Sequence, residues 1–333
     1  MKRIALTVLV IILVAIAGFA FMAYRPDLTR EELMARYTTP ASQFITLPDG
    51  ATAHVRDEGN KSGPALVLVH GSNASLQTWE PWVKLLGGRF RVVSLDLPGH
   101  GLTGAVPNGD YSREGMAAFV HEVTQKLGLM HYAIAGNSMG GGIAALYAEL
   151  YPAELTSLIL VDAAGLPRTL GAPEKLPLAF TLARTPVLRT LMRWSMSHRI
   201  IEEGVRKAFS DQSKVTPEMI GRYEDLNQCC GNRAATVIRF SRAENDSLLE
   251  ARLDEIRVPT LILWGDRDGL IPVAYAHEYA RLITGAKLII YPGVGHIPME
   301  EIAEQSAGDV RSFLEAAVAP ANPVPVTPVT TQP

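Results

Sequence analysis

A serine in a glycine-rich turn is the first residue that could do chemistry. The segment Gly136-Asn137-Ser138-Met139-Gly140 has the form G-x-S-x-G and lies directly between an apolar strand-like run and a helical segment. A sharp strand-to-helix turn of this kind exposes a serine hydroxyl at the carboxyl edge of a sheet. It also leaves no room for side chains two residues before and after the serine. Gly136 and Gly140 meet this requirement, so we expect Ser138 to be a nucleophile.

A serine nucleophile needs a neighbouring base, and the base needs a carboxylate that orients it. His296 follows one strand-like run, Asp266 and Asp268 follow another, and Asp162 stands at the end of a third. The carboxyl ends of parallel strands form the functional edge of such a sheet, so these side chains are expected to meet there. The residues themselves leave all three aspartates open as the acid.

The segment His70-Gly71-Ser72-Asn73 closes a further apolar run. A loop at this place can supply one backbone N–H to an oxyanion hole, while the residue after the nucleophile supplies the other. We therefore expect the amides of Ser72 and Met139 to form the oxyanion hole.

Strand-like runs alternate with helical segments along most of the chain. Residues 65–70 are almost wholly apolar, which is typical of a strand buried on both faces of a parallel sheet. The alternation predicts an α/β fold with a mostly parallel, doubly wound sheet. No strand-like run occurs over residues 165–258, where we expect a helical insertion. The other predicted strands are 44–47, 53–56, 91–95, 132–135, 155–161, 260–264 and 287–291, and the predicted helices are 111–127, 140–150, 274–283 and 303–317.

The two ends of the chain differ from its body. Residues 4–23 are apolar except for a threonine and a glycine, and they follow a lysine and an arginine. At about 1.5 Å per residue such a run spans roughly 30 Å, so residues 1–24 are expected to form a transmembrane anchor that leaves the body on the extracytoplasmic side. The alternative is a signal segment cleaved near residues 15–17, which would make the protein secreted or periplasmic. Residues 25–43 form the linker, and the proline-rich tail 319–333 favours an extended, solvated chain.

Composition excludes several classes of protein. The chain has 31 Lys and Arg against 34 Asp and Glu, a net charge of −3, so nothing indicates a nucleic-acid partner. Apolar residues make up 47% and charged residues 20%, as in ordinary globular proteins. Cys229 and Cys230 are neighbours, and because a disulfide between neighbours is a strained ring, we expect two free or buried thiols.

Five motifs in order resemble those of the α/β-hydrolase fold family. Carried over position by position, the resemblance implies Ser138 as nucleophile, His296 as base and Asp268, rather than Asp266, as acid. It also implies a core of residues 44–164 and 259–318, with residues 165–258 as a cap over the site. The motifs are Leu68-Val69-His70-Gly71, Asp96-Leu97-Pro98-Gly99-His100-Gly101, Gly136-Asn137-Ser138-Met139-Gly140-Gly141, Trp264-Gly265-Asp266-Arg267-Asp268 and Gly293-Val294-Gly295-His296.

No cofactor and no metal are expected. Residues 99–104 match G-x-G-x-x-G, but the dinucleotide fingerprint opens a helix, whereas here Pro98 precedes the motif and Pro107 follows it. The chain has no H-E-x-x-H motif and no Cys/His cluster of the kind that binds zinc.

These observations predict a serine hydrolase that cleaves carboxylic esters, either small esters or lipids, through an acyl-enzyme. The first alternative is C–C bond hydrolysis, because the segment around Ser138 is similar to that of the meta-cleavage-product hydrolases and Arg222 resembles their cap arginine. Those enzymes usually carry Trp after the catalytic histidine, whereas Ile297 stands here. The second alternative is a non-catalytic binding protein on the same fold. Acyl length, alcohol and oligomeric state stay open.

Overall fold

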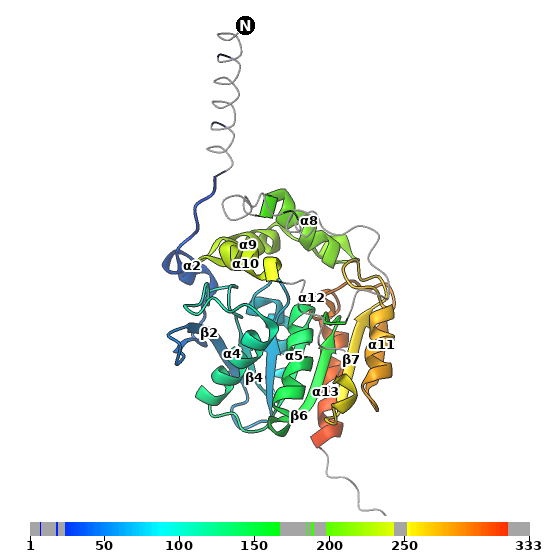
Figure 1. Ribbon diagram of the computed structural model, residues 1–333. Helices are drawn as coiled ribbons and strands as arrows, with labels where there is room; N and C mark the ends of the chain where they lie inside the picture. The colour runs from blue at the N-terminus through cyan, green and yellow to red at the C-terminus, as the bar shows by residue number, and fades with distance from the viewer. Residues whose placement is uncertain are drawn as a thin grey trace, which may run out of the picture.

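The computed structural model describes residues 7, 18, 24–166, 185, 188–189, 198–242 and 252–318. Figure 1 shows a central sheet with helices on both faces and a layer of helices, α8 to α10, above one edge of the sheet. This layer lies between β6 and β7 in the chain. The expected α/β architecture with a mostly parallel sheet is confirmed.

The sheet has eight strands in the order β1-β2-β4-β3-β5-β6-β7-β8. The pairs β1–β2 and β2–β4 are antiparallel, and all other neighbours are parallel. The strands are β1 Ser42–Thr46, β2 Thr52–Gly59, β3 Ala65–Val69, β4 Arg91–Leu95, β5 Tyr132–Asn137, β6 Leu155–Val161, β7 Thr260–Gly265 and β8 Lys287–Tyr291.

Parallel register brings the carboxyl ends of the central strands into step. The last paired residues of β3, β5, β6, β7 and β8 lie side by side, so the loops that follow these strands all emerge at one edge of the sheet. The strand-end pairs are Val69 with Gly136, Asn137 with Val161, Val161 with Leu263, and Gly265 with Tyr291.

Helices cover both faces of the sheet. Because successive side chains of a strand point to opposite faces, Val67 belongs to one apolar core with α4, α5 and α11, and Leu66 and Leu68 belong to the other with α3 and α13. The helices of the core are α3 Glu80–Leu86, α4 Arg113–Lys126, α5 Met139–Leu150, α11 Ala274–Leu282, α12 Pro298–Glu301 and α13 Ala303–Val318. Short 3-10 turns are η1 Leu76–Trp79, η2 Pro152–Glu154, η3 Gln212–Lys214 and η6 Leu253–Glu255.

The sequence patterns located most elements to within a few residues. They missed η1 and α3, which connect β3 to β4, because this stretch has a proline and no regular apolar period. The described part of the insertion includes three α-helices, α8 His198–Ala208, α9 Pro217–Gln228 and α10 Asn232–Arg242. We call residues 198–242, which contain these three helices and the segments that join them, the cap.

The segment before the sheet is attached to the cap (Figure 1). Its helix α2, Arg30–Tyr37, starts at a capping box in which Thr29 and Glu32 each bind the other's backbone N–H. Leu33 is fully buried in a small apolar cluster with Leu226 of α9 and Leu102 of the core. The linker predicted for residues 25–43 therefore contains a helix that fastens the cap.

The prediction of two free thiols was wrong, because the structure joins Cys229 to Cys230 in a disulfide. Cys229 ends α9 in an extended conformation, and Cys230 follows with φ +57°. This turn brings the two sulfur atoms together. The backbone N–H of Cys230 donates to the Leu28 carbonyl (3.1 Å), so the disulfide lies where the α2 segment meets the cap.

Among the described residues, no helix is both long enough and apolar enough to cross a bilayer. The anchor expected at residues 1–24 lies outside the described residues except at Thr7, Gly18 and Tyr24. The tail expected at 319–333 lies entirely outside them.

Replacing Leu33 by alanine should destabilise the protein by about 3 kcal/mol, because it removes a fully buried side chain from the contact between α2 and the cap. Urea unfolding of the purified protein measures this change. Leu85→Ala is the matched control, since the Leu85 side chain of α3 is 37% exposed and its loss should cost less than about 0.5 kcal/mol. Equal losses for both variants would contradict the fastening role of α2.

Candidate active site

Ser138 lies in the turn between β5 and α5, with φ +54° and ψ −120°. A residue other than glycine seldom adopts this conformation, and such strain is typical of functional sites. Surrounding backbone holds the turn in place: the Ser138 N–H donates to the Val161 carbonyl (3.0 Å), and the Ser138 carbonyl accepts from Gly142 (3.1 Å) and Ala164 (2.8 Å). The strained turn is thus held by α5 and by the end of β6 with the loop that follows it.

The two glycines of the motif are required by space. A Cβ atom on Gly136 would overlap the Gly140 carbonyl, and one on Gly140 would overlap the carbonyls of Val69 and His70. The crowding expected from the sequence on both sides of Ser138 is therefore present.

His296 forms a hydrogen bond through Nδ1 to Oδ2 of Asp268 (2.6 Å). The other oxygen of Asp268 accepts from the amides of Leu270 (2.7 Å) and Ile271 (2.9 Å), which fixes the carboxylate. Because Nδ1 donates to Asp268, Nε2 is the nitrogen that can accept a proton. Nε2 is buried and has no hydrogen-bond partner among the described residues.

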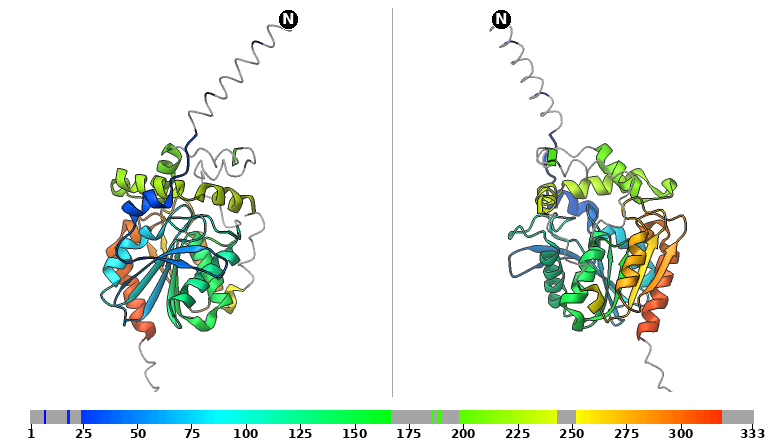
Figure 2. Two further views of the ribbon diagram at one scale, coloured as in Figure 1. Left: turned by 90° about the vertical axis from the view of Figure 1, so that its left-hand side faces the viewer. Right: turned by 45° about the vertical axis from the view of Figure 1, so that its right-hand side comes forward.

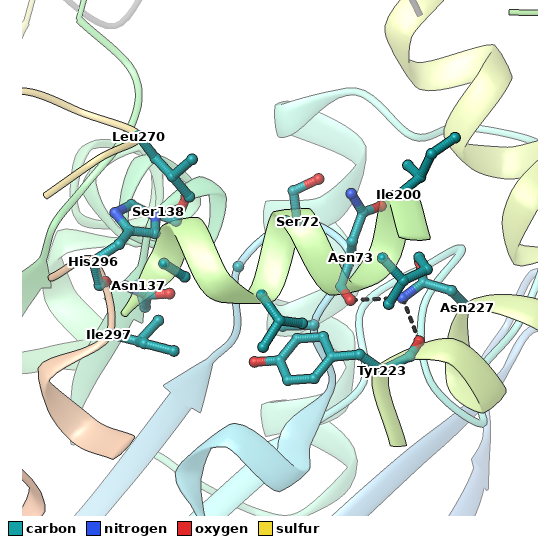
Figure 3. A pocket seen from close by; sticks show the side chains of 16 residues that line it. Ser72, Asn73, Asn137, Ser138, Ile200, Tyr223, Asn227, Leu270, His296 and Ile297 are labelled. Carbon is teal, nitrogen blue, oxygen red and sulfur yellow. Dashed lines mark hydrogen bonds between the residues drawn. The ribbon is translucent and has the colours of Figure 1, made fainter. Parts of the chain in front are cut away.

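Ser138 and His296 lie together at one end of a pocket (Figure 3). The pocket has an empty volume of about 780 Å³, part of it open to solvent. Helix α8 of the cap crosses over it. The pocket also contains Ser72, one of the two expected oxyanion donors, whereas Met139 is the first residue of α5.

The loop that carries Ser72 is held by His70. The Nδ1 atom of His70 bonds to the Gly71 carbonyl (2.7 Å), and its Nε2 accepts from the Leu97 amide (3.0 Å). This pair of partners fixes the tautomer with the hydrogen on Nδ1. Burial lowers the pKa of the His70 imidazole, which keeps the ring neutral. The peptide between Gly71 and Ser72 therefore has a fixed orientation.

The family profile of the "alpha/beta hydrolase fold" matches residues 64–302, most of the chain. The chain belongs to the alpha/beta hydrolase fold family. "Lipase 1" of Psychrobacter immobilis is 28% identical to this hydrolase over 272 residues, which cover 81% of this chain and 82% of the lipase.

Two solved structures place the hydrolase among its relatives. A "membrane phospholipase A" described as a bacterial virulence factor superposes with a TM-score of 0.70 and 27% identity, covering 96% of this chain and all of that one. A meta-cleavage product hydrolase of Pseudomonas fluorescens IP01 superposes with a TM-score of 0.71 at 22% identity, covering 83% of this chain and 98% of that one, a likeness of fold.

The structure separates the three candidate acids of the hydrolase. Asp266 is exposed, and its Oδ1 accepts from the Gly293 amide (2.6 Å), away from the imidazole. Asp268 contacts His296. Asp162 is fully buried behind Asp268, at φ +45°, and its Oδ1 accepts from the Gly265 amide (2.9 Å).

Asp162 and Asp268 are two carboxyl groups in one buried place. Burial raises the pKa of the Asp162 carboxyl well above its usual value, and the charge of Asp268 raises it further. Both effects favour the neutral, protonated form of the Asp162 carboxyl. Sequence reasoning could name Asp162 as a candidate but could not assign it this neutral role.

Ligand atoms of Asp162, Asp268 and His296 lie within 4.8 Å of one another, close enough to hold a metal ion. However, the oxygens of Asp268 already accept three hydrogen bonds, from His296, Leu270 and Ile271. The donor set thus fits a carboxylate that orients an imidazole better than it fits a metal site.

Glu301 connects the histidine loop to the cap. Its side chain is buried, and its oxygens accept from the amides of Gly295 (2.9 Å), Ser210 (3.1 and 3.2 Å) and Asp211 (2.7 Å). The amide of His296 donates to the Ala208 carbonyl at the end of α8 (2.7 Å). The cap therefore helps to hold the backbone of His296. No sequence motif signals this role, because it depends on backbone donors that are distant in the chain.

Arg222 of α9 does not line the pocket. Its Nη2 atom forms an ion pair with Glu300 of α12 (3.0 Å), and the hydroxyl of Tyr223 donates to the same carboxylate (3.1 Å). The residue that resembles the cap arginine of C–C hydrolases thus ties the cap to the core.

Asp162→Asn should become more stable relative to the wild type as the pH rises from about 4 towards 7. A carboxyl with a raised pKa contributes most stability below its unfolded pKa of about 3.9 and loses it as the pH rises towards the folded value, by up to about 1.4 kcal/mol per pH unit. Asparagine does not titrate. Urea unfolding of both proteins at several pH values measures the free energy of unfolding of Asp162→Asn minus that of the wild type. If this quantity falls as the pH rises, the pKa of Asp162 is lowered by folding and the interpretation is wrong.

Proposed function

We propose that this hydrolase cleaves carboxylic esters through a catalytic triad of Ser138, His296 and Asp268. The observation that carries the proposal is the His296 imidazole, which lines the same pocket as Ser138. It is bonded to Asp268 through Nδ1 and has no partner at Nε2 among the described residues. Hydrogen bonds between a serine and its base are often long without substrate, so the free Nε2 fits this role.

In the proposed reaction the Ser138 oxygen attacks the ester carbonyl and passes its proton to Nε2 of His296. The imidazolium, stabilised by Asp268, then protonates the departing alcohol. A water molecule, deprotonated by His296, attacks the acyl-enzyme and releases the acid. The serine hydroxyl is restored at the end of the cycle.

The negative charge on the carbonyl oxygen would be met by the amides of Ser72 and Met139 and by the start of α5. Each oxyanion donor typically contributes about 3 kcal/mol to the stability of the transition state. The bond from His70 to the Gly71 carbonyl supports this role, since it fixes the peptide that contains the Ser72 amide.

Lipid or other apolar esters are the favoured substrates. Apolar side chains of the cap line the pocket, among them Ile201 and Val205 of α8. The similarity to Lipase 1 and to the membrane phospholipase A supports the same substrate class. C–C bond hydrolysis lacks comparable support, because Arg222 bonds to Glu300 instead of lining the pocket.

Ser138→Ala should abolish labelling of the purified protein by a fluorophosphonate probe and should lower the rate of p-nitrophenyl ester hydrolysis by at least about a thousandfold, because it removes the nucleophile. Gel fluorescence and absorbance measure the two effects. Ser213→Ala in the cap, where the side chain is exposed, is the matched control and should be labelled like the wild type.

A wild-type protein that is not labelled would favour a non-catalytic binding protein. A labelled protein that is inert towards esters of every chain length would contradict ester hydrolysis and would favour C–C bond hydrolysis. Retained labelling of Ser138→Ala would remove Ser138 from the mechanism.

We also propose that residues 4–23 anchor the catalytic part to a membrane, on the extracytoplasmic side. The apolar run behind two basic residues supports this localisation. The segment that precedes α2 runs beside the cap (Figure 2), where Arg233 of α10 binds the Arg25 carbonyl and pairs with Asp27, so the anchor would hold the cap side of the molecule towards the bilayer.

The full-length protein should therefore stay in the membrane fraction of the expressing cells after an alkaline carbonate wash. Protease added to spheroplasts, which expose the outer face of the inner membrane, should digest its catalytic part. A version that starts at Tyr24 should be released by the same wash. A full-length protein that is released, and whose first residue lies beyond Ala17, would instead establish a cleaved signal segment.

A further inference from the structure

The pocket over Ser138 has two chemically different ends (Figure 3). Ser138 and His296 lie at one end. At the other end, beneath the start of α8, polar groups gather on the oxyanion loop and on α9. The residues of this polar end are Ser72, Asn73, Tyr223 and Asn227, and the apolar lining includes Ile200, Ile201, Val205, Ala208, Leu270 and Ile297.

Asn227 has a fixed orientation. Its Nδ2 atom donates to the carbonyls of Asn73 (2.8 Å) and Tyr223 (2.7 Å), so both amide hydrogens are in use. The side chain is buried, at 8% exposure, and it lines the pocket. Its Oδ1 atom is therefore an acceptor whose place is determined by the two bonds on the nitrogen.

Asn73 contributes a second acceptor. Its backbone is left-handed, with φ +59°, and its carbonyl is bound by Asn227. Its Oδ1 atom is buried and has no hydrogen-bond partner in the part of the chain that the structure describes. A buried polar atom without a partner is costly, and it is rare enough to require an explanation. A substrate group that donates a hydrogen bond supplies one.

Ser72 adds a donor beside these acceptors. Its Oγ accepts a hydrogen bond from Nη2 of Arg239 on α10 (2.6 Å) and retains its own hydrogen. The polar end thus offers amide oxygens and a hydroxyl hydrogen within one pocket.

We infer that the polar end binds a hydroxyl group of the substrate, so that the preferred esters carry a free hydroxyl, either on a polyol alcohol or on the acyl chain. A hydroxyl both donates and accepts, as these groups require. An alkyl group at this place would leave the Oδ1 atoms of Asn73 and Asn227 without a hydrogen-bond donor. A carboxylate would be repelled, because its negative oxygens would face these two acceptor oxygens. The inference rests on the proposed ester hydrolysis and adds the substrate class.

Matched ester pairs test this inference. Glycerol monobutyrate is compared with propyl butyrate, and methyl hydroxybutyrate with methyl butyrate, through kcat/KM measured by acid release. The hydroxylated member of one pair should be hydrolysed about tenfold more efficiently by the wild type, the value of roughly one net hydrogen bond. The glycerol pair reports a hydroxyl on the alcohol, and the hydroxybutyrate pair reports one on the acyl chain.

Asn73→Gly removes the amide at no cost to the left-handed backbone, because glycine adopts this conformation freely. The ratio of kcat/KM for the hydroxylated ester to kcat/KM for its partner should then fall towards one. Ile200→Val is the matched control: it changes the apolar lining of the same pocket end and should alter both members of a pair alike.

Equal efficiency towards both members of each pair in the wild type would overturn the inference while leaving ester hydrolysis intact. A preference that persists unchanged in Asn73→Gly would also overturn it, since other residues would then select the hydroxyl. No hydrolysis of any of the four esters, together with no labelling of Ser138, would instead refute the proposed function itself. The ratio within a pair does not depend on the fraction of folded protein.

Discussion

The parallel register of β5 to β8 is the constraint on which the site depends. Because these strands end in step, the loops after them deliver Ser138, Asp162, Asp268 and His296 to one edge of the sheet, although these residues are up to 158 positions apart. Strands β5 and β7 are buried throughout and β6 is buried except at Thr156, so a slip by one residue would force side chains of different size into closely packed positions. Packing of the core thereby brings the loops together, and bonds between them, such as the one from His296 to Asp268, complete the site.

Most of this arrangement could be predicted from the sequence, since its causes are local. Apolar runs predicted the parallel strands, and the glycines around Ser138 predicted the turn that the backbone then adopts. The choice of Asp268 over Asp266 was implied only by the family resemblance. Asp266 and Asp268 lie in the same loop, and the hydrogen bonds of that loop determine which of the two side chains points to His296.

Other features could not be predicted because they come from contacts between distant segments. The raised pKa of Asp162 depends on its burial beside a second carboxylate, and the role of Glu301 depends on backbone donors of the cap. Cys229 and Cys230 were expected to be free thiols on general grounds. Their pairing follows from the turn that α9 makes where it meets the segment before α2.

The attachment of His296 to the end of α8 couples the cap to the catalytic loop. The Ala208 carbonyl at the end of α8 accepts from the His296 amide, and Glu301 accepts from the amides of Ser210 and Asp211, which follow α8. This end of α8 therefore cannot move without displacing the backbone of His296. The position of the Ala208 end of α8 and the proton-transfer geometry at His296 are therefore linked, so a change in one alters the other.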